Sequence, residues 1–235
     1  MALVGSTVIA SALAAKLDPF AASLVRFGVA APVLVALCLW RRARLPALTA
    51  SDWAVLVFQA AAGSLGYTVA LVYGLRYASA ADASVITGLM PVSTGAVAVL
   101  ALGERPGARL LLAIGLAASG AILVALGKQE ASGDWRLLGL TLVFAAVLGE
   151  ACFALLQKRI ETPIEPIMVA TLMTLISLGL ALAPGVWAFT RDAAALDDPR
   201  AVAAMIYYGL GPTVLGFWLW YTGASLTQGA EAAAF

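Results

Sequence analysis

One acidic residue, Glu150, lies inside an otherwise apolar stretch, which makes it the first candidate for chemistry in this sequence. A charged side chain on a lipid-facing surface costs about 2.5–3.5 kcal/mol, so a carboxylate there should face a cavity or a partner. Helical spacing places it on one face with Ala146, Ala154 and Gln157, which are small or polar. This face predicts a proton-coupling or ammonium-binding site, or else a pairing with Lys158 near the membrane boundary.

A second polar stripe contains Gln59, Tyr67 and Tyr73, with small residues such as Gly63 and Gly66 between them. The three larger side chains could line a pocket and form hydrogen bonds with a zwitterionic ligand. Small residues also let membrane helices approach closely, so a packing face is the alternative interpretation.

Pro91 interrupts the next apolar stretch, on a side that also carries Ser84, Thr87 and Thr94. Proline removes a main-chain donor and frees a carbonyl, which predicts a kink. Broken helices in transporters often face the transport pathway, and a purely structural kink is the alternative.

The last apolar stretch is rich in aromatic residues, at Tyr207, Tyr208, Phe217, Trp218, Trp220 and Tyr221. Tyrosine and tryptophan commonly anchor helices at the membrane interface, which fits Trp220 and Tyr221. Tyr208 and Trp218 are expected to lie deeper, where they could stack on flat or aromatic ligands.

Arg26 is a cation early in an apolar stretch, and three interpretations fit it. Its long side chain could extend to the outer membrane interface. It could instead pair with an acid such as Asp18 or Asp82, or bind a substrate carboxylate.

These residues lie in stretches of sequence that are long and apolar enough to form membrane-spanning helices. Of the 235 residues, 63% are hydrophobic and 11% are charged, and the mean hydropathy is +0.97. A soluble domain carries about 25% charged residues, whereas a membrane-spanning helix needs about 20 mainly apolar ones. The composition therefore predicts an all-α integral membrane protein. Its candidate windows are 2–15, 20–40, 53–75, 83–102, 108–127, 137–157, 166–189 and 201–226.

Several functional classes conflict with the composition. Histidine is absent, and Cys38 and Cys152 lie in apolar stretches without a ligand cluster, so no metal site and no Ser–His catalytic pair are expected. No aspartate pair lies inside a window, and we expect neither enzyme activity nor a cofactor. The net charge of +1 argues against nucleic-acid binding. The sequence has no Gly-x-x-x-x-Gly-Lys loop, so ATP should not drive it directly.

The connections carry a weak orientation signal. Arg41, Arg42 and Arg44 form the densest basic group, and cytoplasmic loops of membrane proteins are enriched in Lys and Arg. This distribution favours an N-terminus in the cytoplasm.

The sequence also repeats itself weakly. Asp18-Pro19 and Glu165-Pro166 each precede an apolar window, and Gly74 recurs 149 residues later as Gly223, followed in both places by a small and acidic motif. The repeat predicts two related units. An odd number of helices in the first unit would invert the second across the membrane, as in many secondary transporters.

By this division, residues 1–130 form a first five-helix unit and residues 131–235 form a second, incomplete one. The window 2–15 would be the second half of a first helix, and the last two helices would be largely absent. A fragment that only binds partner helices is therefore a further hypothesis.

Short motifs in a particular order carry a family resemblance: Gly5-Ser6-Thr7, Arg26-Phe27, Tyr73, Ala80-Ala81, Pro91, Gly103-Glu104-Arg105, Gly115 and Gly120. The chain resembles the drug/metabolite transporter superfamily, specifically the EamA-type ten-helix exporters, and among them the YddG-like amino-acid exporters. The resemblance implies an inverted repeat of five-helix units around a central cavity in the bacterial inner membrane. It also implies a monomer with a small-molecule substrate.

The expected function is secondary export of small hydrophilic metabolites, amino acids (aromatic ones included) first among them, by alternating access. The alternatives are a proton-coupled exporter of drugs or lipophilic cations and a nucleotide-sugar carrier, although phosphates would need more basic residues than Arg26 alone. The residues expected to line the substrate cavity are Ser6, Gln59, Tyr67, Tyr73, Thr87, Met90, Pro91, Glu150, Tyr208 and Trp218.

Overall fold

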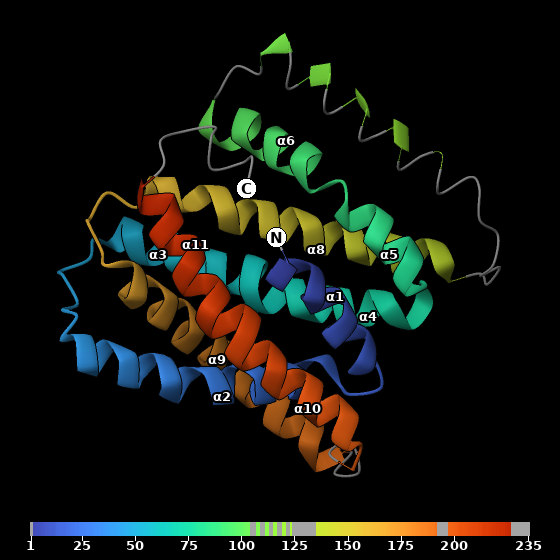
Figure 1. Cartoon of the computed structure of the whole chain (residues 1–235), viewed down its shortest axis with the longest axis horizontal. Coiled ribbons are helices and arrows are strands. Elements are labelled where there is room, and N and C mark those ends of the chain that lie inside the picture. Colours follow the sequence, from blue (N-terminus) through green and yellow to red (C-terminus); the bar gives the residue numbers. More distant parts are fainter. Residues whose placement is uncertain are drawn as a thin grey trace.

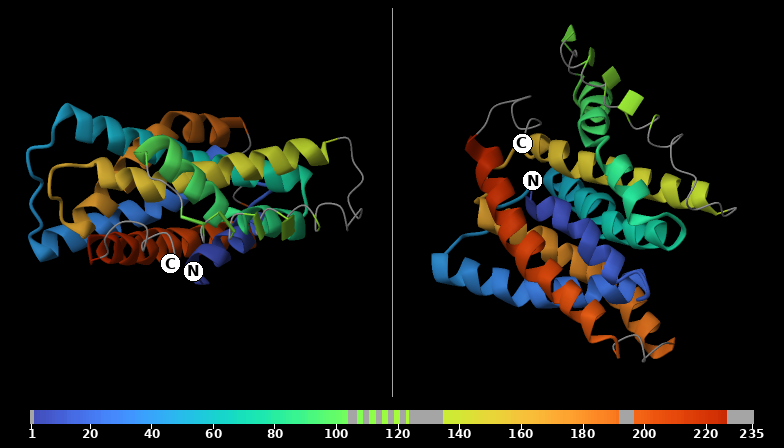
Figure 2. Two further views of the ribbon diagram at one scale, coloured as in Figure 1. Left: turned by 90° about the horizontal axis from the view of Figure 1, so that it is seen from above. Right: turned by 45° about the vertical axis from the view of Figure 1, so that its right-hand side comes forward.

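The computed structural model describes residues 2–103, 135–191 and 197–226, together with nine positions between 107 and 123. Every regular element in these ranges is a helix, and the helices lie side by side in a bundle (Figure 1). Two views at other angles show the same arrangement (Figure 2).

Six segments of the described chain are long and apolar enough to cross a membrane, and they match six of the eight predicted windows. The first window forms α1 (Ala2–Leu13), which has only 12 residues. Of the 20 residues in the window 108–127, 12 lie outside the described residues. The six segments are Pro19–Arg41, Ala50–Tyr77, Ala81–Val99, Arg136–Arg159, Pro166–Arg191 and Pro199–Gly223.

Two of these segments change to π-helix near their middle. In the first, α3 (Ala50–Gln59) continues through η1 (Ala60–Leu65) into α4 (Gly66–Tyr77). A side chain at Gly66 would meet the Ala61 carbonyl oxygen at 2.6 Å, so the wide turn requires a glycine here.

The second π-helical turn lies in the last described segment. There α10 (Pro199–Tyr208) continues through η4 (Gly209–Gly216) into α11 (Phe217–Leu226). Pro212, inside η4, has no N–H to donate and so favours a departure from regular α-helical bonding. Wide turns of this kind inside α-helices often occur at functional sites.

Pro91 lies at a helix start rather than at a kink within one helix. The helix α5 (Ala80–Thr87) ends before Gly88, and α6 (Met90–Leu102) begins with Pro91 in its first turn, where no intrahelical N–H is needed. The interruption predicted near Pro91 therefore divides this segment into two helices.

Glycines allow two helices from different parts of the sequence to touch along their length. The helix α8 (Arg136–Leu156), which ends in the short η2 (Gln157–Arg159), packs along η1 and α4. A side chain at Gly149 would meet the Ala62 carbonyl oxygen at 2.5 Å, and one at Gly139 would meet the Ala78 nitrogen at 2.7 Å. Such close main-chain approach is the usual reason for small residues between membrane helices.

A second pair of long helices forms the other side of the bundle. The helix α2 (Pro19–Arg41) packs along α9 (Pro166–Arg191), and Gly185 lies against the Phe20 carbonyl oxygen in this contact. The π-helical segment η4 packs on α2, while η1 packs on α9. The two π-helical segments thus occupy corresponding places in the bundle.

Asp52 joins the start of α3 to the loop before α9. Its carboxylate accepts hydrogen bonds from the nitrogens of Thr49 and Glu161, at 3.1 Å each, and from the Thr162 hydroxyl. We expect Asp52→Ala to lower the melting temperature in detergent by several degrees, because it leaves two N–H groups without an acceptor. Asp198→Ala, which removes only the cap of α10, should lower it less. Equal losses would contradict the role of the contacts to residues 161 and 162.

Candidate functional site

The guanidinium of Arg26 is deeply enclosed in the described bundle, with 3% of the residue exposed. It lies about 10 Å along α2 from the start of the helix, which places it inside the apolar zone. Its Nε donates a hydrogen bond to Thr213 Oγ1 at 2.8 Å, and its Nη1 donates to Thr68 Oγ1. The guanidinium therefore connects α2 to α4 and to the π-helical segment η4.

Two aromatic rings enclose the same guanidinium. Its Cζ lies 3.9 Å from the ring centre of Tyr208 and 4.6 Å from that of Phe27. The negative faces of aromatic rings attract a cation, most strongly where water is excluded. Neither the rings nor the threonine hydroxyls carry a charge, so they stabilise the cation without neutralising it.

Glu150 on α8 supplies the opposite charge. Its carboxylate interacts electrostatically with Arg26 and with the hydroxyls of Tyr67 and Tyr208. Among the residues that the structure describes, however, no group forms a salt bridge or hydrogen bond with it. The cation and the carboxylate are thus close enough to interact but are not in direct contact.

Hydroxyl groups occupy the region around these two charges. Thr7 Oγ1 and the Tyr67 hydroxyl share a hydrogen bond of 3.1 Å, and the Tyr208 hydroxyl interacts with Thr7 and Thr68. Thr7 brings α1 into the site. We call this group of side chains the Arg26 cluster; its members are Thr7, Arg26, Tyr67, Thr68, Glu150, Tyr208 and Thr213.

Local sequence explains why these helices meet at Arg26. A side chain at Gly209 would lie 2.6 Å from the Arg26 carbonyl oxygen, so glycine lets η4 contact α2 directly. The wide π-helical turn also lets Thr213 Oγ1 donate to the Tyr208 carbonyl, five residues earlier, at 3.0 Å. On the other side, the contact of Gly149 with Ala62 brings the helix that carries Glu150 against η1.

Of the predicted cavity residues, Tyr67, Glu150 and Tyr208 lie in the Arg26 cluster. Ser6 precedes the cluster residue Thr7 in α1. Its Oγ accepts a hydrogen bond of 3.0 Å from the Tyr207 hydroxyl, and this bond connects α1 to α10. The Tyr207 side chain is itself partly exposed, at 47%. Gln59 lies elsewhere in the core, where its Nε2 donates to the Phe153 carbonyl at 2.7 Å and its Oε1 has no partner within the described residues.

The remaining predicted residues are not members of the Arg26 cluster. The Arg41 guanidinium stacks on Trp218 at 4.9 Å, and the Arg76 guanidinium stacks on Tyr73 at 5.0 Å. Thr87 Oγ1 donates to the Ser84 carbonyl of its own helix. Met90 and Pro91 start α6, and the side chain of Pro91 lies outside the described set.

Sequence reasoning missed Thr7, Thr68 and Thr213. Of its three interpretations of Arg26, the one that paired it with Asp18 or Asp82 is wrong. Asp18 caps the start of α2, with its Oδ1 accepting from the Phe20 nitrogen at 2.9 Å. Asp82 forms a salt bridge of 3.0 Å with Arg136 instead. A useful signal was present, because an arginine inside an apolar window must find acceptors there.

The described residues offer no group of three or more His, Cys, Asp or Glu side chains that could hold a metal ion. Hydrogen-bonding groups and one pair of opposite charges remain. This arrangement can bind and orient a small polar ligand.

Charged residues buried between the helices of a multi-pass protein indicate a functional site inside the membrane. The sequence model of the EamA-like transporter family matches residues 1–126 and 137–235, and the chain belongs to this family. The match extends over both proposed units of the chain.

Two relatives come from Bacillus subtilis (strain 168). The uncharacterized transporter YetK is 30% identical over 229 residues, covering 96% of this chain and 69% of the relative. The uncharacterized transporter YdeK is 30% identical over 220 residues, covering 92% of this chain and 72% of the relative. Family and relatives alike point to a transporter rather than an enzyme.

Proposed function

We propose that this protein is a secondary transporter that exports small hydrophilic metabolites, amino acids first among them, across the bacterial inner membrane. The observation that carries the proposal is the Arg26 cluster. Arg26 and Thr68 come from the first half of the chain, whereas Glu150 and Thr213 come from the second. Secondary transporters commonly bind their substrates where two such halves meet.

An inverted repeat is part of the proposal, and three pairs of positions support it at a constant separation of 149 residues. The first residues of the two π-helical segments, Ala60 and Gly209, form one pair. The residues that cap α3 and α10, Thr49 and Asp198, form another. The third is the pair of glycines recognised in the sequence, at 74 and 223. The match of one family to both halves of the chain also supports two units of common design.

The repeat suggests how the cluster takes part in alternating access. Arg26 binds Thr68 within its own half and Thr213 in the other half, so relative motion of the halves must change the bond to Thr213. A ligand bound at the cluster contacts both halves, and its free energy of binding can favour one arrangement over the other. The site then opens to one side of the membrane at a time.

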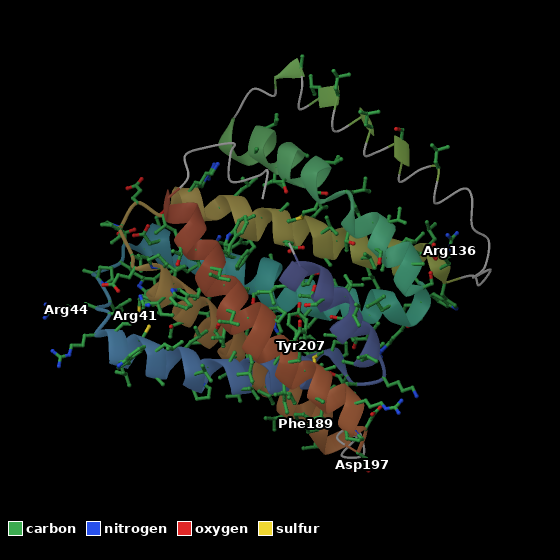
Figure 3. All side chains as sticks on the ribbon, in the orientation of Figure 1. Arg41, Arg44, Arg136, Phe189, Asp197 and Tyr207 are labelled. Carbon is green, nitrogen blue, oxygen red and sulfur yellow. The ribbon has the colours of Figure 1, made fainter. Side chains whose placement is uncertain are left out.

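The basic group near the end of α2 supports an orientation. Arg41 and Arg44 lie at one end of the bundle, and Arg136 and Asp197 lie at the other (Figure 3). Cytoplasmic loops are enriched in Lys and Arg, so we assign the end with Arg41 and the N-terminus of the chain to the cytoplasm.

The proposed function is tested by uptake of radiolabelled amino acids into proteoliposomes that contain the purified protein, with and without a pH gradient. Saturable uptake that unlabelled amino acids inhibit is the expected result. Failure to take up any amino acid, together with uptake of lipophilic cations such as tetraphenylphosphonium, would replace this proposal with drug export. The unbonded carboxylate of Glu150 beside two tyrosines is the feature that would favour this second function.

Glu150 is the group through which a proton gradient would act. The charged or titratable side chains that interact with it are Arg26, Tyr67 and Tyr208. We expect Glu150→Gln to abolish the stimulation of uptake by a pH gradient, because the amide cannot carry a proton across the membrane. Asp82→Asn, which changes an acid bonded to Arg136 outside the cluster, should retain the stimulation. A normal gradient response in Glu150→Gln would remove proton coupling from this residue.

A further inference from the structure

We infer that Arg26 and Glu150 bind the two charged ends of a zwitterion, Arg26 the carboxylate and Glu150 the ammonium group. The inference rests on the proposed function and names the chemistry of its substrate: an α-amino acid with an uncharged side chain. It follows from how the two groups are bonded, from their net charge, and from what surrounds them.

The guanidinium of Arg26 has donors left over. A guanidinium carries five N–H bonds. Those from Nε and Nη1 to Thr213 and Thr68 are the hydrogen bonds of this side chain within the described residues. The remaining donors at the end of the guanidinium are those that bind a carboxylate through two parallel hydrogen bonds. The two threonines hold the guanidinium in place and leave this end for a ligand.

The Glu150 carboxylate likewise has the capacity to accept hydrogen bonds from a ligand. No donor of the described chain reaches its carboxylate, although Arg26 is near enough to interact with it through space. A buried carboxylate usually accepts hydrogen bonds, and one without any gains most from a donor that arrives with a ligand. An ammonium group provides three donors and the opposite charge.

The two charges add to zero, which sets the charge of the preferred ligand. In surroundings of low dielectric, an unmatched charge is costly, so a ligand must bring both charges or neither. A simple amine would leave Arg26 unmatched, and a simple carboxylic acid would leave Glu150 unmatched. A zwitterion matches both residues at once.

The rest of the cluster indicates what the ligand side chain should be. Thr7, Tyr67, Thr68, Tyr208 and Thr213 are uncharged, and they present rings, methyl groups and hydroxyls. No third charged group of the described chain interacts with Arg26 or Glu150. Acidic and basic amino acids would bring a charge that these side chains do not match.

The test measures dissociation constants of three ligands with the same carbon skeleton, for purified protein in detergent, by isothermal titration calorimetry. The ligands are leucine, its decarboxylated amine isoamylamine, and its deaminated acid 4-methylpentanoate. The unmodified protein should bind leucine at least tenfold more tightly than either analogue.

Opposite shifts are expected from the two single variants. Arg26→Gln leaves a net negative site. The affinity for isoamylamine relative to that for 4-methylpentanoate should therefore rise at least tenfold. Glu150→Gln leaves a net positive site, and the same ratio of affinities should fall at least tenfold, in favour of 4-methylpentanoate. The double variant R26Q/E150Q restores a neutral site, and it should bind leucine weakly without preferring either analogue.

Matched controls make the same charge changes elsewhere. Arg76→Gln removes a cation that donates to the carbonyls of Ala15 and Leu17, and Asp82→Asn removes an acid bonded to Arg136. Both should keep the ligand order of the unmodified protein. If Arg26→Gln does not fold, Glu150→Gln still decides the matter, because the carboxylate makes no hydrogen bond that folding within the described chain requires.

The outcomes separate this inference from the proposed function. Leucine binding that keeps the same ligand order in both variants, or shifts in the same direction in both, overturns the zwitterion site while leaving amino-acid transport in place. Binding of none of the three ligands, together with no amino-acid uptake in proteoliposomes, overturns both.

Discussion

Replacing Gly63 by alanine is expected to destabilise the protein by about 1–3 kcal/mol, the usual cost of forcing extra atoms into a packed interface. A Cβ at this position would overlap the Phe153 Cβ and lie 2.7 Å from the Gly149 carbonyl oxygen. Neither contact can relax by rotating a flexible side chain, because one involves main chain and the other the first atom of a ring-bearing side chain. The helices α8 and η1 must therefore separate.

Gly28→Ala is the matched control for this substitution. Gly28 also lies inside a membrane-spanning helix, but a Cβ there would meet no atom within 4 Å. This variant should keep or slightly raise the melting temperature, since alanine favours a helix over glycine. Stability is read from the fraction of monodisperse protein that survives heating in detergent. Similar melting curves for Gly63→Ala and Gly28→Ala would contradict the close packing of α8 on η1.

The Gly63 variant also bears on function. The contact that it opens lies next to Gly149 and therefore next to Glu150, which belongs to the Arg26 cluster. A separation of α8 from η1 should move the carboxylate away from Arg26. We expect transport by this variant to fall further than its lowered stability explains, as measured by uptake per correctly folded molecule at a temperature well below melting.

The membrane-spanning segments could be predicted from sequence because lipid imposes a simple requirement on each of them. A helix that crosses the membrane must be apolar along about 20 residues, and this pattern is visible without any knowledge of its neighbours. Helix starts were similarly accessible, since Asp18 followed by Pro19 is a local signal and does cap α2.

The partners of Arg26 could not be predicted, because they depend on how distant helices pack. Thr68 and Thr213 lie 42 and 187 residues away in the sequence. A threonine inside a helix usually bonds to its own main chain, as Thr174 does with Ala170, so the residue type alone gives no indication of a distant contact. The π-helical turn that aims Thr213 at α2 likewise lacks a reliable sequence signal.

The location of Trp218 likewise could not be predicted from the sequence. Its position in an aromatic-rich window suggested a place in the substrate cavity, whereas the structure stacks it on Arg41 at the end of α2. An aromatic ring suits both a ligand pocket and the membrane interface, so its identity does not decide between them. Depth in the bundle decides between them, and this depth follows from how α11 packs on α9.

Replacing Thr68 and Thr213 together by valine is expected to have the second large effect. Valine has nearly the shape of threonine, so the change removes the two hydroxyls that accept from Arg26, together with the hydrogen bonds that they donate to the Ser64 and Tyr208 carbonyls. A hydrogen bond to a charged group contributes about 1.5–3 kcal/mol, and a buried cation left without acceptors adds a penalty of its own. We expect the double variant to lose about 3 kcal/mol of stability or more.

The corresponding double replacement by serine separates the hydroxyls from the methyl groups that valine retains. Serine keeps both acceptors, so T68S/T213S should restore most of the stability and the affinity for the transported ligand that T68V/T213V loses. The measurements are heat survival in detergent and the concentration for half-maximal uptake. Because the threonines fix the guanidinium where it bridges both halves of the chain, affinity and stability should fall together in the valine variant and recover together in the serine variant. Recovery in neither property would mean that Arg26 is held by the rings of Tyr208 and Phe27 rather than by the hydroxyls.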